Sequence, residues 1–134
     1  MEFTLFLLIA LILSIVTASR IASSFIIVET EYGPVKGVQK SSILGRAFKS
    51  FQGIPYIKPP LGKLRFREAQ PPESWTEPLD VTSEPPAYCN FNCLSNQLEG
   101  HEDAAVINVY APQVETEKLF PVMVFIHGGG FEVS

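Results

Sequence analysis

The sequence predicts an incomplete α/β fold, and three observations lead to that prediction. Residues 104–112 (AAVINVYAP) and 119–127 (LFPVMVFIH) are almost continuous apolar runs, which are typical of strands buried on both faces of an α/β sheet. Eleven prolines and nine glycines among 134 residues favour strands and turns over a helix bundle. No long helix is evident after the first twenty residues, although helices must cover such a sheet. We therefore expect the chain to form the first part of a larger fold.

The first residues predict a secretory signal peptide. An apolar run from Phe3 to about Val16 is followed by small residues suited to cleavage. Glu2 departs from the pattern, because a basic residue is usual there. A signal anchor is the alternative, but the run is shorter than the roughly 20 residues that span a bilayer. We expect residues 1–18 to be removed and residues 19–134 to be secreted, extracellular and not membrane-attached.

Three short strands are expected next, in a small antiparallel amino-terminal sheet. Residues 25–29 are apolar and β-branched, and the turn EYGP follows them. Val35 and Val38 flank Gly37 in the return strand. A second turn, SSILG, leads to a third strand, RAFKSFQ, in which residues alternate between the two faces.

A long extended arm follows this sheet. Residues 53–86 show no periodicity, and their prolines fix φ and remove backbone donors. Such a segment must lie over something larger than itself. We expect Gly62, Leu64, Phe66 and Trp75 to dock the arm onto a core.

Charge and cofactor patterns exclude several classes of function. The net charge is −4 and the basic residues are scattered, so no basic stripe is expected for a nucleic-acid backbone. His101, Glu102 and Asp103 resemble metal ligands, but adjacent residues of an extended chain point in alternating directions. We predict no nucleic-acid partner, no metal and no cofactor.

The sequence His-Gly-Gly-Gly at residues 127–130 is the strongest chemical signal. Consecutive glycines after a buried strand leave peptide N–H groups open, and two such donors can stabilise an oxygen that becomes negative during acyl transfer. This is the oxyanion-hole motif found after an early strand of α/β-hydrolases. The alternative is a glycine-rich or phosphate-binding turn, which the absence of G-x-G-x-x-G and G-K-[ST] weakens.

The motif does not stand alone. The stretches ETEYGPVKGV, FQGIPYIKPPLGKLRF, QPPESW, HEDAAVINVYAP and PVMVFIHGGGF occur in this order. In them the chain resembles the type-B carboxylesterase and cholinesterase family, and is most similar to insect-type secreted esterases. The resemblance implies an α/β-hydrolase fold and a small-molecule carboxylic ester substrate, hydrolysed through an acyl-serine intermediate.

The resemblance also implies roles for the residues around the motif. Gly129 and Gly130 would donate the two oxyanion N–H bonds, with Gly128 allowing the turn. Phe131 would line the acyl pocket. In this family the catalytic base lies far downstream, so His127 is expected to shape the loop rather than to act as the base.

Structural roles follow from the same resemblance. Glu102 would pair with Arg65 in a buried ion pair that fastens the arm to the core. The family usually has a cysteine at the position of Ala104, bridged to the position of Cys89, so that disulfide cannot form here. A local bridge between Cys89 and Cys93 is the expected substitute, although such a loop is very small. The loop also lacks the tryptophan that binds choline, which disfavours choline esters.

The catalytic triad is missing from the sequence. No G-x-S-x-G occurs, Ser83 and Ser95 lack elbow glycines, and neither His101 nor His127 has a recognisable serine partner. We therefore expect this chain alone to be inactive, and we interpret the stop after Ser134 as a truncated gene model, a splice product or a fragment. The alternatives are a non-catalytic cholinesterase-like adhesion protein and a short secreted binding protein.

Overall fold

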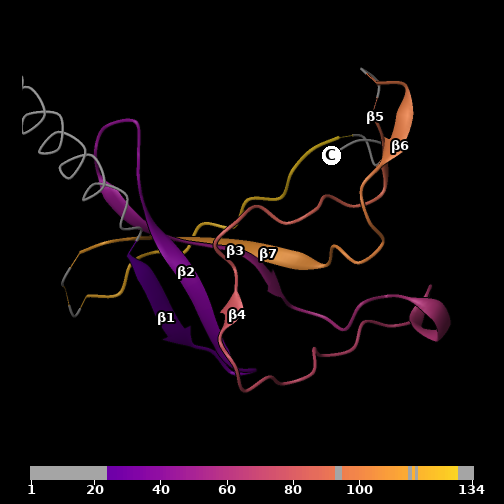
Figure 1. The fold of residues 1–134 in the computed structure, drawn as a ribbon, viewed down its shortest axis with the longest axis horizontal. Helices are drawn as coiled ribbons and strands as arrows, with labels where there is room; N and C mark the ends of the chain where they lie inside the picture. The colour runs from indigo at the N-terminus through magenta and orange to yellow at the C-terminus, as the bar shows by residue number, and fades with distance from the viewer. Residues whose placement is uncertain (1–23, 93–94, 115, 117, 130–134) are drawn as a thin grey trace, which may run out of the picture.

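The fold is built on one five-stranded sheet (Figure 1). The computed structural model describes residues 24–92, 95–114, 116 and 118–129. Four strands lie in the order β1-β2-β3-β7, and each is antiparallel to its neighbour. Their bounds are Phe25–Glu29 for β1, Pro34–Ser41 for β2, Ala47–Pro55 for β3 and Val106–Pro112 for β7. The predicted amino-terminal sheet is thus confirmed, and so is a strand within residues 104–112.

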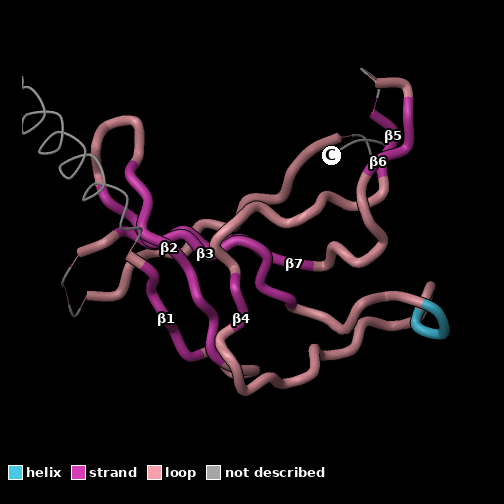
Figure 2. The backbone as a smooth tube through the Cα atoms, in the orientation of Figure 1, coloured by secondary structure: helices cyan, strands magenta, loops and turns pink. Residues whose placement is uncertain are grey.

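The fifth strand, β4 (Leu79–Asp80), enters between two strands that diverge (Figure 2). Residues 38–41 of β2 pair with β3, whereas Val35 and Lys36 pair in parallel with β4. Val81, directly after β4, then bridges β2 and β3. Its N–H donates to the Lys36 carbonyl at 2.9 Å, and its carbonyl accepts from the Gln52 N–H at 2.7 Å. The arm is therefore part of the sheet itself.

A small core lies where this arm meets the sheet. Val35, Phe51 and Val81 are buried, and Trp75 and Leu79 pack against them. The Trp75 indole N–H donates to the Pro34 carbonyl at 2.7 Å. The docking role expected for Trp75 is thus confirmed.

The rest of the arm is more open than expected. It contains one short 3₁₀ turn, η1 (Gly62–Leu64), in which Leu64 is half-buried and Gly62 exposed. Phe66 is 98% exposed, so its predicted docking role is wrong. Its φ of +58° is a left-handed conformation that is uncommon for a residue other than glycine.

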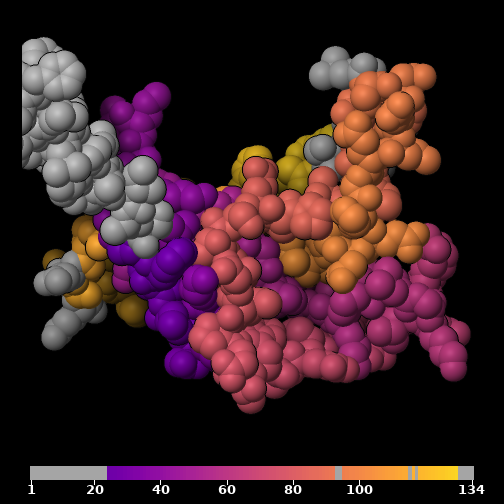
Figure 3. All heavy atoms as spheres, viewed as in Figure 1, coloured from indigo at the N-terminus to yellow at the C-terminus, as the bar shows by residue number. Residues whose placement is uncertain are grey.

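A second, two-stranded sheet was not expected from the sequence. β5 (Asn90–Asn92) and β6 (Gln97–Glu99) form an antiparallel hairpin. Figure 3 shows this hairpin and the turn between β2 and β3 projecting from the body of the molecule. Strands of three residues carry too little alternation to be recognised in a sequence.

The predicted strand at residues 119–127 is wrong for this structure. The segment pairs with no other described residue, and its apolar side chains, Leu119 and Phe125 among them, are exposed. An apolar run becomes a strand only when a neighbouring strand satisfies its backbone N–H and C=O groups. In the described part of the chain no element takes that place.

Candidate functional site

The candidate site is the glycine segment that follows residues 119–127. Gly128 is exposed, and a side chain there would meet no other atom within 4 Å. Gly129 has a φ of +136°, in the region that favours glycine. Gly129 therefore needs the conformational freedom of glycine, and the role of Gly128 in the turn remains a prediction. Gly130 and Phe131, to which the sequence assigned a second donor and the acyl pocket, lie outside the described residues.

His127 contacts the same segment. Its ring Nδ1 lies 2.7 Å from the Gly128 carbonyl oxygen, so Nδ1 carries the proton and donates to that oxygen. Among the described residues, no serine or carboxylate contacts the exposed ring. The contact is one that a loop-shaping residue would make, and that role remains a prediction.

Arg65 and Glu102 meet as the sequence predicted. Arg65 Nη2 lies 2.5 Å from Glu102 Oε1, which joins the arm to the segment before β7. The pair is not buried, however, because the side chains are 56% and 47% exposed. Water screens such a pair, so its contribution is about 0–1 kcal/mol rather than the 3–5 kcal/mol of a buried pair.

His101 and Asp103 flank this pair without joining it. Both backbone polar groups of His101 are hydrogen-bonded: its N–H donates to the Ala87 carbonyl, and its carbonyl accepts from the Cys89 N–H. No group of three potential metal ligands occurs in the described part of the chain. These backbone bonds therefore close the base of the β5–β6 hairpin.

Cys89 is a free, exposed cysteine at the start of this hairpin. Its predicted partner, Cys93, lies outside the described residues, so the bridge stays a prediction. Ala104, which stands where the family has a cysteine, is buried.

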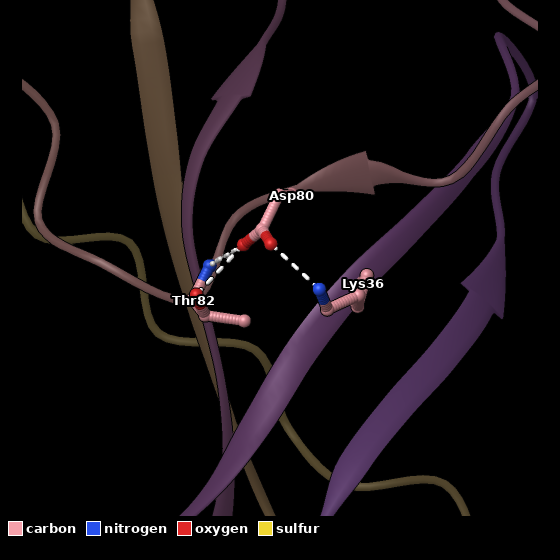
Figure 4. A network of polar contacts seen from close by, with 3 residues as sticks. All are labelled: Lys36, Asp80 and Thr82. Atoms are coloured by element: carbon pink, nitrogen blue, oxygen red, sulfur yellow. Dashed lines mark hydrogen bonds and ion pairs between the residues drawn. The ribbon is translucent and has the colours of Figure 1, made fainter.

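The sequence reasoning missed a polar network that fixes the arm (Figure 4). Asp80 Oδ2 lies 2.7 Å from Lys36 Nζ, and Asp80 Oδ1 accepts from the Thr82 hydroxyl at 2.7 Å and from the Thr82 N–H at 3.2 Å. The hydrogen bond from Lys36, together with those from Thr82, lowers the pKa of Asp80 to about 2. The only sequence signal was the short pattern Asp-x-Thr, which is common in turns.

Other carboxylates at the surface are held ionised in the same way. The Lys58 ammonium hydrogen-bonds Glu73 and lowers its pKa. Hydrogen bonds from Asn92 and Ser95 lower the pKa of Glu99. All of these tie loops together, and none faces the glycine segment in a described contact.

An antiparallel sheet that leads into an His-Gly-Gly-Gly segment is the architecture of the amino-terminal part of an α/β-hydrolase. The solved structure of juvenile hormone esterase from Manduca sexta, with OTFP covalently attached, matches 83% of this chain and 22% of that chain, with a TM-score of 0.70 and 36% identity. A thermophilic PNB esterase matches 81% of this chain with a TM-score of 0.64 and 38% identity. The fold is therefore part of the α/β-hydrolase fold of these esterases.

The chain belongs to the carboxylesterase family, whose pattern matches residues 24–134. It is 44% identical over 104 residues to Esterase B1 of Culex pipiens and 45% identical over 108 residues to juvenile hormone esterase of Tribolium castaneum. Each match covers 78% of this chain, but only 19% and 18% of the relatives. The chain thus spans about a fifth of the length of the curated relatives that it matches.

Proposed function

We propose that this chain supplies the oxyanion-binding part of a carboxylic ester hydrolase that works through an acyl-serine intermediate. The observation that carries the proposal is the φ of +136° at Gly129, directly after His127-Gly128 in a chain of the carboxylesterase family. A glycine in this conformation exposes its peptide N–H without a side chain in the way. The N–H groups of Gly129 and Gly130 would stabilise the negative oxygen of the tetrahedral intermediate.

These donors do not suffice for the reaction. Acyl transfer also needs a nucleophile, a base and an acid that orients the base, and the 134 residues hold no G-x-S-x-G elbow. We infer that hydrolysis belongs to a protein in which this chain is joined to those groups. The chain alone is expected to show no turnover of a simple ester such as p-nitrophenyl acetate.

The first test is to sequence the full-length cDNA across the codon for Ser134. An open frame that continues to a G-x-S-x-G elbow and later acidic and histidine residues would support the proposal. A frame that continues without the elbow serine would instead support a non-catalytic adhesion protein. A stop codon after Ser134 in an abundant transcript would overturn the proposal that this chain belongs to an enzyme.

A matched pair of variants tests the oxyanion role in such a longer product. Gly129→Ala is expected to lower kcat about a hundredfold, because the side chain forces the backbone out of its conformation and misplaces a donor. Gly45→Ala is the control, since Gly45 is also exposed and also has a positive φ, of +73°. Equal loss in both variants, or none in Gly129→Ala, would contradict the role.

We further propose that residues 1–18 are a signal peptide and that the mature protein is extracellular. The apolar run with small residues behind it supports this assignment. Over the residues that the structure describes, no helix combines the length and apolar character needed to cross a membrane. The test is amino-terminal sequencing of the protein from the medium of expressing insect cells, where a start at residue 19 or 20 is expected.

A further inference from the structure

The turn between β2 and β3 carries two adjacent exposed aliphatic side chains. Ile43 is 101% exposed and Leu44 is 77% exposed. Single exposed apolar residues need no explanation, but turn tips are normally built from Gly, Asn, Asp, Pro and Ser. Two adjacent aliphatic side chains at a projecting tip (Figure 3) therefore call for a partner.

The tip is held in one conformation. The Gly45 N–H donates to the Ser42 carbonyl at 2.9 Å, and the Ser42 N–H donates to the Arg46 carbonyl at 2.9 Å. Gly45 has a φ of +73°, the pattern of a three-residue hairpin loop closed by a left-handed glycine. The Ser42 hydroxyl also accepts from the Arg46 N–H at 3.1 Å. Because the loop is already ordered, a partner that binds both aliphatic side chains would not have to order it.

Positive charge is concentrated in the part of the sequence that contains this tip. Contrary to the scattered distribution expected from composition, the segment from Tyr32 to Arg67 contains no Asp or Glu, although the whole chain has a net charge of −4. It holds eight of the ten Lys and Arg residues: Lys36, Lys40, Arg46, Lys49, Lys58, Lys63, Arg65 and Arg67. Nearly all of the chain's positive charge therefore lies in the β2–β3 hairpin and the arm that follows it.

The cations nearest the tip have no carboxylate partner in the described structure. Lys36, Lys58 and Arg65 are paired, with Asp80, Glu73 and Glu102. Lys40 instead binds the side-chain amide of Gln52, and neither Arg46 nor Lys49 forms a described ion pair. Arg46 is exposed beside the tip, and the half-buried Lys40 and Lys49 lie behind it on β2 and β3. Positive charge behind an apolar tip is complementary to an anionic surface with an apolar interior.

Although the sequence led us to expect no membrane partner, we propose that the β2–β3 turn docks this protein on a lipid surface that carries anionic phospholipids. Ile43 and Leu44 enter the boundary between headgroups and acyl chains, while Arg46, Lys49 and Lys40 contact the phosphates. The proposal does not rest on ester hydrolysis, because vesicle binding measures it directly. A single apolar tip gives weak, reversible attachment rather than permanent anchoring.

The test is cosedimentation of the full chain with vesicles of phosphatidylcholine containing about 30% phosphatidylserine. Leu44→Ser is expected to weaken binding about tenfold, because a buried leucine side chain is lost from the apolar phase. Leu98→Ser is the matched control: Leu98 is 81% exposed on another hairpin, beside the acidic Glu99, and its loss should leave binding unchanged. Arg46→Gln is expected to weaken binding about fivefold and to reduce its salt dependence.

Three results would overturn the proposal. Equal losses in Leu44→Ser and Leu98→Ser would mean general apolar adhesion. Equal binding to pure phosphatidylcholine vesicles would show that anionic headgroups do not contribute to binding. If Arg46→Gln weakened vesicle binding and Leu44→Ser did not, the chain would attach by charge alone, without inserting apolar side chains.

Discussion

Asp80 is held ionised by side chains that come from different parts of the chain. Lys36 on β2 is 44 residues away in sequence, and Thr82 is two residues away. Because the folded pKa of about 2 lies below the ordinary value of 3.8, the network stabilises the fold fully above about pH 4. That contribution is lost as the pH falls from about 4 toward about 2, where the carboxylate becomes protonated.

The first prediction concerns this carboxylate. In an NMR titration of the carboxyl carbon of Asp80, we expect a midpoint near pH 2 for the unchanged chain. Lys36→Gln should raise the midpoint toward 3.8, because the largest cause of the shift is removed. Lys49→Gln, which removes a lysine that forms no described ion pair, should not move it. A midpoint near 3.8 in the unchanged chain would contradict the network.

A second residue-scale prediction concerns Gly33, which lies beneath Trp75. A side-chain carbon at Gly33 would come within 2.2 Å of the Trp75 carbonyl oxygen, and its φ of +149° disfavours any other residue. Gly33→Ala should therefore undock Trp75, the only tryptophan of the chain. We expect a red shift of the tryptophan emission and a lower urea midpoint.

The control for this prediction is Gly62→Ala. Gly62 also has a positive φ, of +54°, but a side chain there would meet nothing within 4 Å. If both variants shift the emission equally, backbone strain rather than contact with Trp75 explains the effect. If neither does, the docking contact is wrong.

At the scale of elements, the pairing of β3 with β7 depends on one irregular position. The register shifts between Gln52 and Ile54, and Gly53 at that point has a φ of +94°. Its N–H leaves the strand ladder and donates to Asn108 Oδ1 on β7 at 2.9 Å. The bulge is thus closed by a side chain, which bends β3 toward the arm.

The element-scale prediction is that Asn108→Ala loosens this bulge. The Gly53 N–H loses its acceptor, which costs about 1 kcal/mol at an exposed site and speeds hydrogen exchange of that amide about fivefold. NMR-detected exchange measures this directly. Gln39→Ala, on the exposed side of β2, should leave the Gly53 amide unchanged. Unchanged exchange in Asn108→Ala would show that the bulge does not need this bond.

At the scale of the whole molecule, little apolar surface is buried. The buried apolar residues of the described chain are few, whereas the side chains of residues 122–126 are all exposed; the buried ones are Val35, Phe51, Val81, Ala104 and Ala105. A contiguous apolar segment of this kind promotes association in water. The relatives are about four times as long as this chain, so a complete esterase has much more chain with which to cover such a segment.

The whole-molecule prediction follows from that segment. The chain alone should bind the dye ANS and self-associate, and Val122→Lys with Val124→Lys should reduce both effects. The control, Ser74→Lys with Ser83→Lys, adds the same charge at exposed polar positions. It should reduce ANS binding and self-association less than the valine variant does. Light scattering measures the association. Equal improvement in both double variants would assign the effect to net charge alone.

The strands β1, β2, β3 and β7 and the family could be predicted from the sequence, because alternation and apolar runs are local properties and the family motifs are continuous. It also placed Trp75 against the core and joined Arg65 to Glu102. How these parts are paired and exposed was decided by contacts between distant segments.

Those decisions depend on residues that are distant in sequence. β4 becomes a strand because β2 and β3 diverge around it. The pKa of Asp80 is low because Lys36 on the neighbouring strand donates a hydrogen bond to it. The apolar run at residues 119–127 is not a strand because no described element pairs with it. Periodicity encodes the ability to form a strand, whereas hydrogen bonding and burial need a partner that the same stretch of sequence does not contain.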